Sequence, residues 1–175
     1  MRRLNRLLVG TAILGLICMN IPAHARDISM SDKRFLKNAA EAGNFEIEGS
    51  KLALAKSKDA DILRFARMMT DDHAQAALKL KDLATRRGVE LPTEPSLVQQ
   101  AKLKYLEMRE GVKFDKSYAT HIGVSAHEQA VKLFEDAAED ATDADIKKFA
   151  ADTLPVLKKH LEEAKRIDIR VNQDD

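Results

Sequence analysis

The sequence predicts an all-α fold, a four-helix bundle, from three observations. Apolar residues recur at three- and four-residue steps through most of residues 31–168, which is the period of a helix. Only 7 glycines, 4 prolines and 5% aromatic residues occur among 175 residues, which argues against a β-sandwich or barrel. A hydrophobic content of 45% and a charged content of 33% supply one core and one polar surface. We therefore expect a single domain.

Four long helices and one short helix are expected along the chain. The first runs from Ser31 to about Ser57, and the second runs from its cap Asp59 to Gly88. A loop with two prolines follows, and then the short helix is expected at 96–109. The third long helix is expected at 113–141 and the fourth at 142–168, with a polar tail at 169–175. The long link between the second and third helices fits either a crossover of the ferritin-like kind or a short helix packed across one end.

The third long helix has an irregular apolar pattern. Phe114, Tyr118 and Ile122 define one face, whereas Val131 and Phe134 belong to another face that is rotated well away from the first. Gly123 lies near the change of face, alongside Val124. The pattern therefore predicts a bend in the middle of this helix.

Residues 1–25 have the features of a secretory signal peptide. Arg2, Arg3 and Arg6 precede an apolar stretch at 7–21, and Ala23-His24-Ala25 is a small-x-small cleavage site. The stretch is short for a membrane span, which needs about 20 residues. Cleavage removes three of the 29 bases and none of the 28 acids, so the mature chain would carry a formal charge of −2.

The expected location follows from this signal peptide. The mature chain would begin with a short extension, 26–30, and lie in the periplasm, with outer-membrane association or secretion as alternatives. It would contain no cysteine and no further apolar run long enough to span a membrane. The nearly balanced charge excludes a strongly basic nucleic-acid binder. The sequence indicates no particular protein partner, and it is compatible with a homo-oligomer.

One polar residue interrupts the apolar stripe of each long helix. These residues are Glu46, His73, His127 and His160, and all four lie near the same level if the helices pack side by side. A buried carboxylate or imidazole is unfavourable unless it is paired or coordinated. The four residues therefore predict a metal site for a single Zn, Fe, Mn or Cu ion. The alternative is an internal hydrogen-bond network in which Glu46 accepts from the imidazoles.

Several other residues lie close to these four in the helical pattern. His121 is a spare candidate ligand if the third helix is rotated, and Asp72 is placed to orient His73. Glu163 lies at the edge of its stripe and is expected to be solvated. Met69 is expected to fill the core rather than to bind copper.

Short motifs along the chain resemble a known family. They are the segments at 35–40 and 49–53 with Glu46 between them, 65–69 followed by Asp72-His73, Phe114-Asp115 with Tyr118, His127 with Phe134, 149–150 followed by Leu154-Pro155, and His160-Leu161. In order and spacing they resemble domain of unknown function family 4142, exported bacterial proteins often labelled as outer-membrane or periplasmic. The resemblance implies a ferritin-like bundle with an export signal, and it favours His127 over His121. It implies no established reaction.

The chain departs from the di-iron ferritin-like pattern. Such proteins carry Glu-x-x-His pairs on two helices, but Thr70 and Leu157 stand three residues before His73 and His160. A mononuclear site, or none, is therefore the better inference.

The leading functional hypothesis is metal handling or envelope stress tolerance by a His-rich core. The first alternative is a structural or interaction bundle without metal. The second is a metal-dependent oxidase or peroxidase, although the sequence shows no catalytic motif, so an enzyme is the weaker hypothesis.

Overall fold

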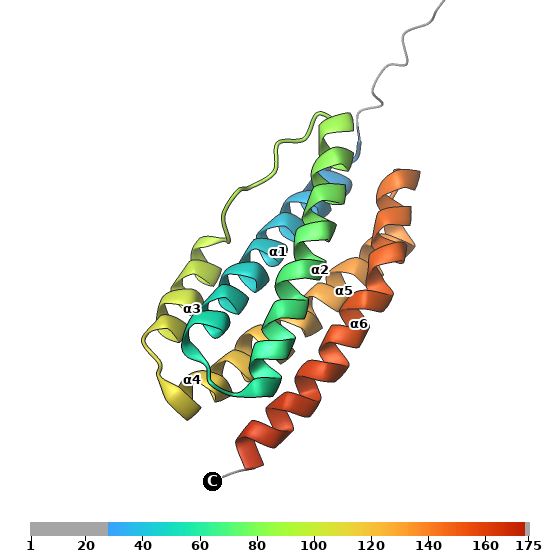
Figure 1. Cartoon of the computed structure of the whole chain (residues 1–175). Coiled ribbons are helices and arrows are strands. Elements are labelled where there is room, and N and C mark those ends of the chain that lie inside the picture. The colour runs from blue at the N-terminus through green and yellow to red at the C-terminus, as the bar shows by residue number, and fades with distance from the viewer. Residues whose placement is uncertain (1–27, 174–175) are drawn as a thin grey trace, which may run out of the picture.

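The computed structural model describes residues 28–173, and every regular element in this part of the chain is helical (Figure 1). The elements are α1 (Met30–Lys56), α2 (Ala60–Arg86), α3 (Leu97–Glu107), α4 (Gly111–Tyr118), the π-helical segment η1 (Ala119–Ser125), α5 (Ala126–Asp140) and α6 (Ala144–Gln173). The predicted all-α bundle is thus confirmed. The predicted signal peptide, 1–25, lies outside the described residues.

The bundle contains one long crossover (Figure 1). α1 and α2 form an antiparallel pair, as do α5 and α6. The segment between α2 and α3 returns along the bundle, so that the continuous rod of α4, η1 and α5 runs in the same direction as α2. α3 lies beside α1 and α4. The link between α2 and α3 was expected to be either a crossover or a short helix packed across one end. The structure contains both a crossover and a short helix.

Local sequence signals fix most of the helix ends. The Asp59 carboxylate accepts from the backbone N–H groups of Asp61 and Ile62 at the start of α2. Gly88 follows the end of α2 with a φ of 64°, which favours glycine. The Ser96 hydroxyl and the Gln99 side chain form a capping box on α3. At α1 the cap is Ser29 rather than the predicted Ser31, since the Ser29 hydroxyl accepts from the N–H of Asp32.

The irregular helix predicted at 113–141 contains a π-helical segment rather than a simple bend. The extra residue in its wide turn rotates everything after it by about 100° relative to an uninterrupted α-helix. Phe114 and Tyr118 are therefore buried before the segment, Ile122 is buried within it, and His127 and Phe134 are buried after it.

Two glycines let η1 pack closely against its neighbours. A Cβ added at Gly49 of α1 would lie 2.8 Å from the Ile122 side chain, and one at Gly123 would lie 3.1 Å from the Ala164 Cβ of α6. Both glycines therefore serve close helix approach.

The predicted boundary of the fourth helix is wrong at its C-terminal end. α6 continues to Gln173 instead of giving way to a polar tail at 169. Val171 is buried, and the Arg170 guanidinium lies 2.7 Å from the Asp59 carboxylate. Ile28, in the predicted N-terminal extension, is also buried. Tertiary contacts thus hold Ile28 and the last turns of α6 against the bundle.

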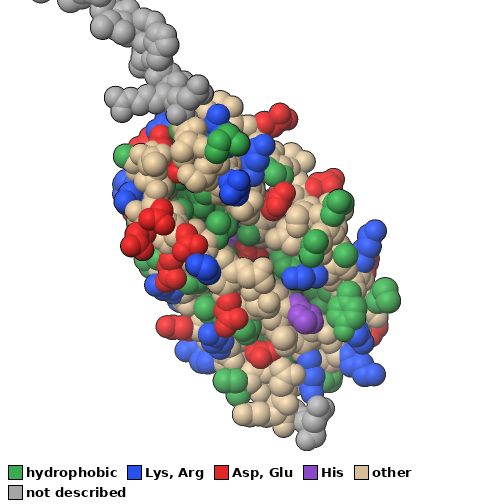
Figure 2. Space-filling view, turned by 180° about the vertical axis from the view of Figure 1, so that it is seen from behind, with side chains coloured by type: hydrophobic (Ala, Val, Ile, Leu, Met, Phe, Trp, Pro, Cys, Tyr) green, Lys and Arg blue, Asp and Glu red, His purple; other side chains and the backbone are tan. Residues whose placement is uncertain are grey.

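The core consists of two apolar clusters with a polar layer between them. One cluster contains Phe35, Phe134 and Phe149, whose ring centroids lie 5.1–6.5 Å apart. The other contains Phe65 and Tyr118, among others. Basic and acidic side chains are interspersed on the face drawn in Figure 2. No helix of the described part is long and apolar enough to cross a membrane.

Candidate metal centre

The polar layer brings together the four residues that the sequence singled out. Glu46 comes from α1, His73 from α2, His127 from α5 and His160 from α6. Each is at most 6% exposed. Each occupies the core-facing stripe of its helix, as its spacing from neighbouring apolar residues predicts. The proximity of these groups is thus a property of the fold, whereas metal binding stays a prediction.

The three imidazoles form a compact triangle. Their ring centroids are 5.4–5.6 Å apart, and one ligand atom from each ring lies within 4.8 Å of the others. Three nitrogens bound tetrahedrally to one ion at about 2.1 Å lie about 3.4 Å apart. Ring movements on the order of 1 Å would therefore bring the three nitrogens onto one ion.

One nitrogen of each ring is engaged on the outside of the triangle. His73 Nδ1 lies 3.3 Å from a carboxylate oxygen of Glu46. His127 Nδ1 donates to the carbonyl of Ile122 at 3.3 Å and lies 3.5 Å from the other Glu46 oxygen. His160 Nε2 donates to the Asp72 carboxylate at 2.9 Å. The Ile122 carbonyl and the Asp72 carboxylate only accept, so they orient two rings and place the proton of His127 on Nδ1 and that of His160 on Nε2. Glu46 in its ionised form would do the same for His73.

The second nitrogen of each ring is buried and has no hydrogen-bond partner. These atoms are His73 Nε2, His127 Nε2 and His160 Nδ1. Because the outer nitrogens carry the protons, the inner nitrogens of neutral rings carry lone pairs. With Glu46 ionised, the site therefore presents three acceptors and no donor, which is the arrangement that a cation satisfies.

Burial sets the protonation of these groups. It lowers the pKa of His127 to about 4, with a further contribution from the neighbouring His160, and it lowers the pKa of His73 well below its usual value. The pKa of His160 is also lowered by burial, although Asp72 opposes this. All three rings are thus neutral at pH 7, the form that ligates metals.

Glu46 responds to burial in the opposite sense. Burial raises its pKa to about 8, so the carboxyl is mainly protonated at pH 7 in the absence of a nearby cation. A cation within the triangle would favour the ionised form, because opposite charges stabilise each other at low dielectric.

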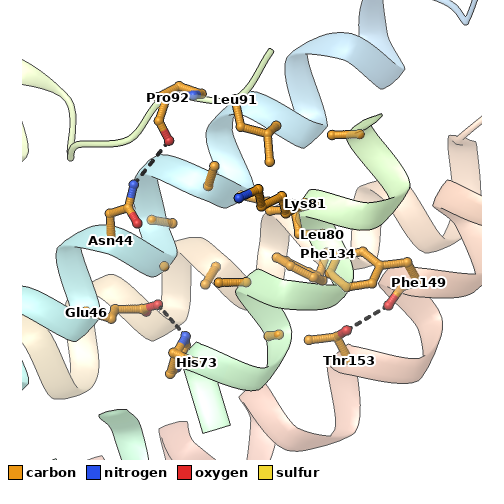
Figure 3. Close-up of a pocket in the computed structure, with 18 of the residues that line it drawn as sticks. Asn44, Glu46, His73, Leu80, Lys81, Leu91, Pro92, Phe134, Phe149 and Thr153 are labelled. Carbon is orange, nitrogen blue, oxygen red and sulfur yellow. Dashed lines mark hydrogen bonds and ion pairs between the residues drawn. The ribbon is translucent and has the colours of Figure 1, made fainter. Parts of the chain in front are cut away.

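A cavity of about 420 Å³ adjoins the triangle. Glu46 and His73 lie at one end of it, and the remaining wall is mostly aliphatic and aromatic (Figure 3). His160 and Asp72 also line it, whereas His127 is not part of its wall. Three of the four residues of the polar layer thus border an apolar space, whereas the inner nitrogens themselves are buried.

Comparison with known proteins places this chain in a family. The family model of DUF4142, a domain of unknown function, matches residues 20–167. The chain belongs to this family. No curated protein matches the chain.

A solved structure supports the fold of this DUF4142 protein. The crystal structure of a DUF305 fragment from Deinococcus radiodurans is similar with a TM-score of 0.71, over 82% of this chain and 98% of that chain. The two sequences are 12% identical, so the likeness concerns the fold alone.

Four neighbouring residues can be compared with their predicted roles: Met69 fits, Asp72 and His121 do not, and Glu163 is only partly solvated. Asp72 orients His160 of α6, not the adjacent His73, because its carboxylate points across to the facing helix. Glu163 is partly covered and pairs with Arg166. His121 is exposed beside the Tyr105 ring, away from the triangle. Met69 is fully buried in the apolar cluster, as expected of a core residue.

Sequence reasoning did not identify the Ile122 carbonyl as a partner of His127. This contact depends on the π-helical turn, which leaves a main-chain oxygen within reach of a ring five residues later. The rotated apolar faces around Gly123 were the available signal for such a turn.

Proposed function

We propose that this protein binds a single transition-metal ion through His73 Nε2, His127 Nε2 and His160 Nδ1, and that it serves metal handling in the cell envelope. Glu46, which the sequence suggested as a fourth ligand, holds the imidazoles from outside instead. A three-histidine set with an open fourth position suits Zn, and imidazole ligands also suit Cu and Fe. Mn is the weakest candidate, because it prefers oxygen ligands.

The observation that carries this proposal is the set of three buried, unpartnered ring nitrogens. Each opposite nitrogen is held by a carboxylate or a carbonyl. This is the outer arrangement that metal-bound histidines almost always have, since it fixes the tautomer and makes the ligating nitrogen more basic.

The structural alternative, a hydrogen-bond network without metal, accounts for only half of the contacts. It explains the outer nitrogens, but it leaves the three other ring nitrogens buried without a hydrogen-bond partner. Unpaired buried polar atoms are unfavourable by about 1–3 kcal/mol each. A metal ion satisfies all three at once.

The test is metal loading of the mature chain, prepared without an affinity tag. Equilibrium dialysis against Zn, Cu(II), Fe(II) and Mn, followed by metal analysis, should give one ion per chain for at least one of these metals. His160→Ala should weaken binding at least tenfold, whereas His121→Ala should leave it unchanged. The exposed His121 is a matched control, because it removes an imidazole of the same chain. Equal binding by both variants would favour the metal-free network.

The envelope role rests on the predicted signal peptide and on the family resemblance. An exported chain would acquire its ion outside the cytoplasm, where it could buffer a metal that is present in excess. Cells without the protein should then become more sensitive to the metal that loads the site in vitro. Rescue by the wild type but not by His160→Ala would tie that phenotype to the triangle.

A further inference from the structure

The short helix α3 has a second apolar face, which points away from the bundle. Its inner face contains the buried Leu106 and the partly buried Leu103, and it packs beside α1 and α4 (Figure 1). The outer face, with the C-cap Met108, carries five exposed apolar residues: Leu97, Val98, Ala101, Tyr105 and Met108. Because each residue turns a helix by about 100°, these five fall within an arc of about 100°. They form one continuous stripe, which we call the outer stripe of α3.

Exposed apolar side chains are concentrated on this stripe. Of the nine large apolar side chains that are exposed in residues 28–173, four lie here, from Tyr105 at 43% exposed to Leu97 at 83%. The other five are spread over α1, α2, α4 and α6. Figure 2 shows hydrophobic side chains gathered among basic ones at the edge where α3 lies, on the right of this view. Single exposed apolar residues are ordinary, whereas a contiguous group of them marks an interaction surface.

Basic side chains border the outer stripe of α3 on both sides. Lys104 follows one edge of the stripe and Lys102 follows the other, and both are exposed. Within the described part of the chain, neither ammonium group has an ion-pair or hydrogen-bond partner. The Arg109 guanidinium lies 4.3 Å from the centroid of the Tyr105 ring. Two unpaired positive charges and one arginine thus surround the apolar side chains.

The acidic residues of this segment lie off the stripe. Glu107 is about 80° beyond its nearer edge. The carboxylate of Glu110 pairs with Lys56 at 2.6 Å, and Glu94 precedes the helix. The stripe and its borders are therefore locally positive, although residues 26–175 carry a formal charge of −2. Attraction to an anionic partner would act at this stripe and not over the whole surface.

An anionic lipid surface is the partner that this combination fits. Helices that lie in a membrane interface have an apolar face bordered by lysine and arginine. The aliphatic stems of Lys102 and Lys104 can follow apolar surface while their ammonium groups reach lipid phosphates. A tyrosine such as Tyr105, with an apolar ring and a polar tip, is typical of the headgroup level.

A second copy of this chain fits the stripe less well. A symmetric dimer would pair the stripe with itself. Lys102 and Lys104 of one copy would then lie close to the same residues of the other, and like charges across an interface repel each other.

We propose that the outer stripe of α3 docks this protein on the surface of an anionic phospholipid membrane. The apolar side chains would enter the boundary between headgroups and acyl chains, and the bordering lysines would contact lipid phosphates. The rest of the bundle would stay in water. This inference does not depend on the metal site, and it assigns a role to a surface that metal binding does not use.

The first measurement is sedimentation of the mature chain with lipid vesicles. Vesicles of equal parts phosphatidylglycerol and phosphatidylcholine should bind it at least tenfold more tightly than phosphatidylcholine vesicles, and added salt should weaken this binding. Leu97→Asn combined with Met108→Asn should weaken it at least tenfold. The matched control is Leu78→Asn combined with Ile169→Asn, which removes two exposed apolar side chains elsewhere and should bind as the wild type does.

A second pair of variants tests the charges. Lys102→Glu combined with Lys104→Glu should abolish the preference for phosphatidylglycerol. Lys79→Glu combined with Lys81→Glu makes the same change in net charge at two exposed lysines of α2 with the same spacing. This control should retain the preference.

A tryptophan probe reports which surface enters the lipid. The chain contains no tryptophan, so one introduced residue gives the whole signal. The emission of Tyr105→Trp should shift to shorter wavelength when the phosphatidylglycerol vesicles are added. The emission of Leu78→Trp should stay unchanged.

Several outcomes would overturn the inference. The wild-type chain could fail to bind the anionic vesicles or could bind both vesicle types equally, and neither result involves a variant that must fold. Binding that survives Leu97→Asn with Met108→Asn would place the contact elsewhere. A dimer of the wild type that these two substitutions dissociate, without vesicle binding, would show that a second copy covers the stripe.

Discussion

At the residue scale, the candidate site depends on which side of each imidazole is occupied. Glu46, Asp72 and the Ile122 carbonyl hold the outer nitrogens, and this leaves the inner nitrogens of three neutral rings free for an ion. The orienting groups thus matter as much as the ligands, because they set the tautomers.

Replacing Asp72 tests this orienting role. Asp72→Asn should weaken metal binding about 10- to 100-fold, because the carboxylate that holds the His160 ring is lost. The exposed neighbour Asp71 gives the matched control, and Asp71→Asn should bind metal as the wild type does. The measurement is a competitive zinc titration of both variants. Equal affinities would show that His160 does not depend on Asp72.

Glu46→Gln should change how stability depends on pH in the metal-free protein. The pKa of Glu46 is raised by burial from 4.5 to about 8, so its protonated form supports the fold below pH 4.5 and this support is lost as the pH rises through 8. Glutamine does not titrate and resembles the protonated acid. The wild type should therefore lose on the order of 4 kcal/mol relative to Glu46→Gln between pH 4.5 and 8.

Urea unfolding at several pH values, in the presence of a chelator, would measure this difference. A constant difference between the two proteins across this pH range would mean that the Glu46 carboxyl is not perturbed in the fold.

At the scale of elements, the π-helical segment η1 sets the register between the two apolar clusters. It rotates α5 so that His127 faces the triangle, and it brings the Ile122 carbonyl to the His127 ring. Gly49 and Gly123 allow this segment to lie against α1 and α6. One short irregularity therefore joins helix packing to the geometry of the site.

Two glycines of α1 make opposite predictions for the same substitution. Gly49→Ala should destabilise the protein by about 1–3 kcal/mol, because the new Cβ would lie 2.8 Å from the Ile122 side chain. Gly43→Ala should stabilise it by up to about 1 kcal/mol, because the position is helical and open. Chemical denaturation of both variants measures the two changes. Similar effects of the two substitutions would contradict the close packing of η1.

At the scale of the whole molecule, the bundle places a polar layer between two apolar clusters and a cavity beside that layer. The surrounding apolar surface raises the pKa of Glu46 and lowers the pKa of His73 and His127. The layer is therefore unfavourable for stability by itself, which is the usual condition of a site kept for function.

The predicted signal peptide gives a test on the intact chain. Expression in a bacterium with a periplasm should yield a mature protein that begins at Arg26, because cleavage is expected after Ala25. Intact-mass measurement of the periplasmic fraction would detect the loss of residues 1–25. A variant with Ala25→Arg should remain uncleaved. Recovery of the uncleaved wild-type chain from the membrane fraction would contradict the prediction.

The helices and the candidate residues could be predicted from local sequence patterns. Capping residues such as Asp59, Ser96 and Gly88 act on backbone groups a few positions away, and the helical period identifies the buried stripe. A polar residue on such a stripe is visible without a structure, so Glu46, His73, His127 and His160 could be chosen from spacing alone.

How those residues contact one another depends on the packing of the helices. The partner of Asp72, the inward-facing nitrogens and the outer position of Glu46 depend on side chains from facing helices, which no local pattern specifies. The same is true of the C-terminal turn of α6, where Val171 and Arg170 are held by contacts distant in sequence. Local order comes from interactions over about four residues, whereas a site between helices depends on their packing.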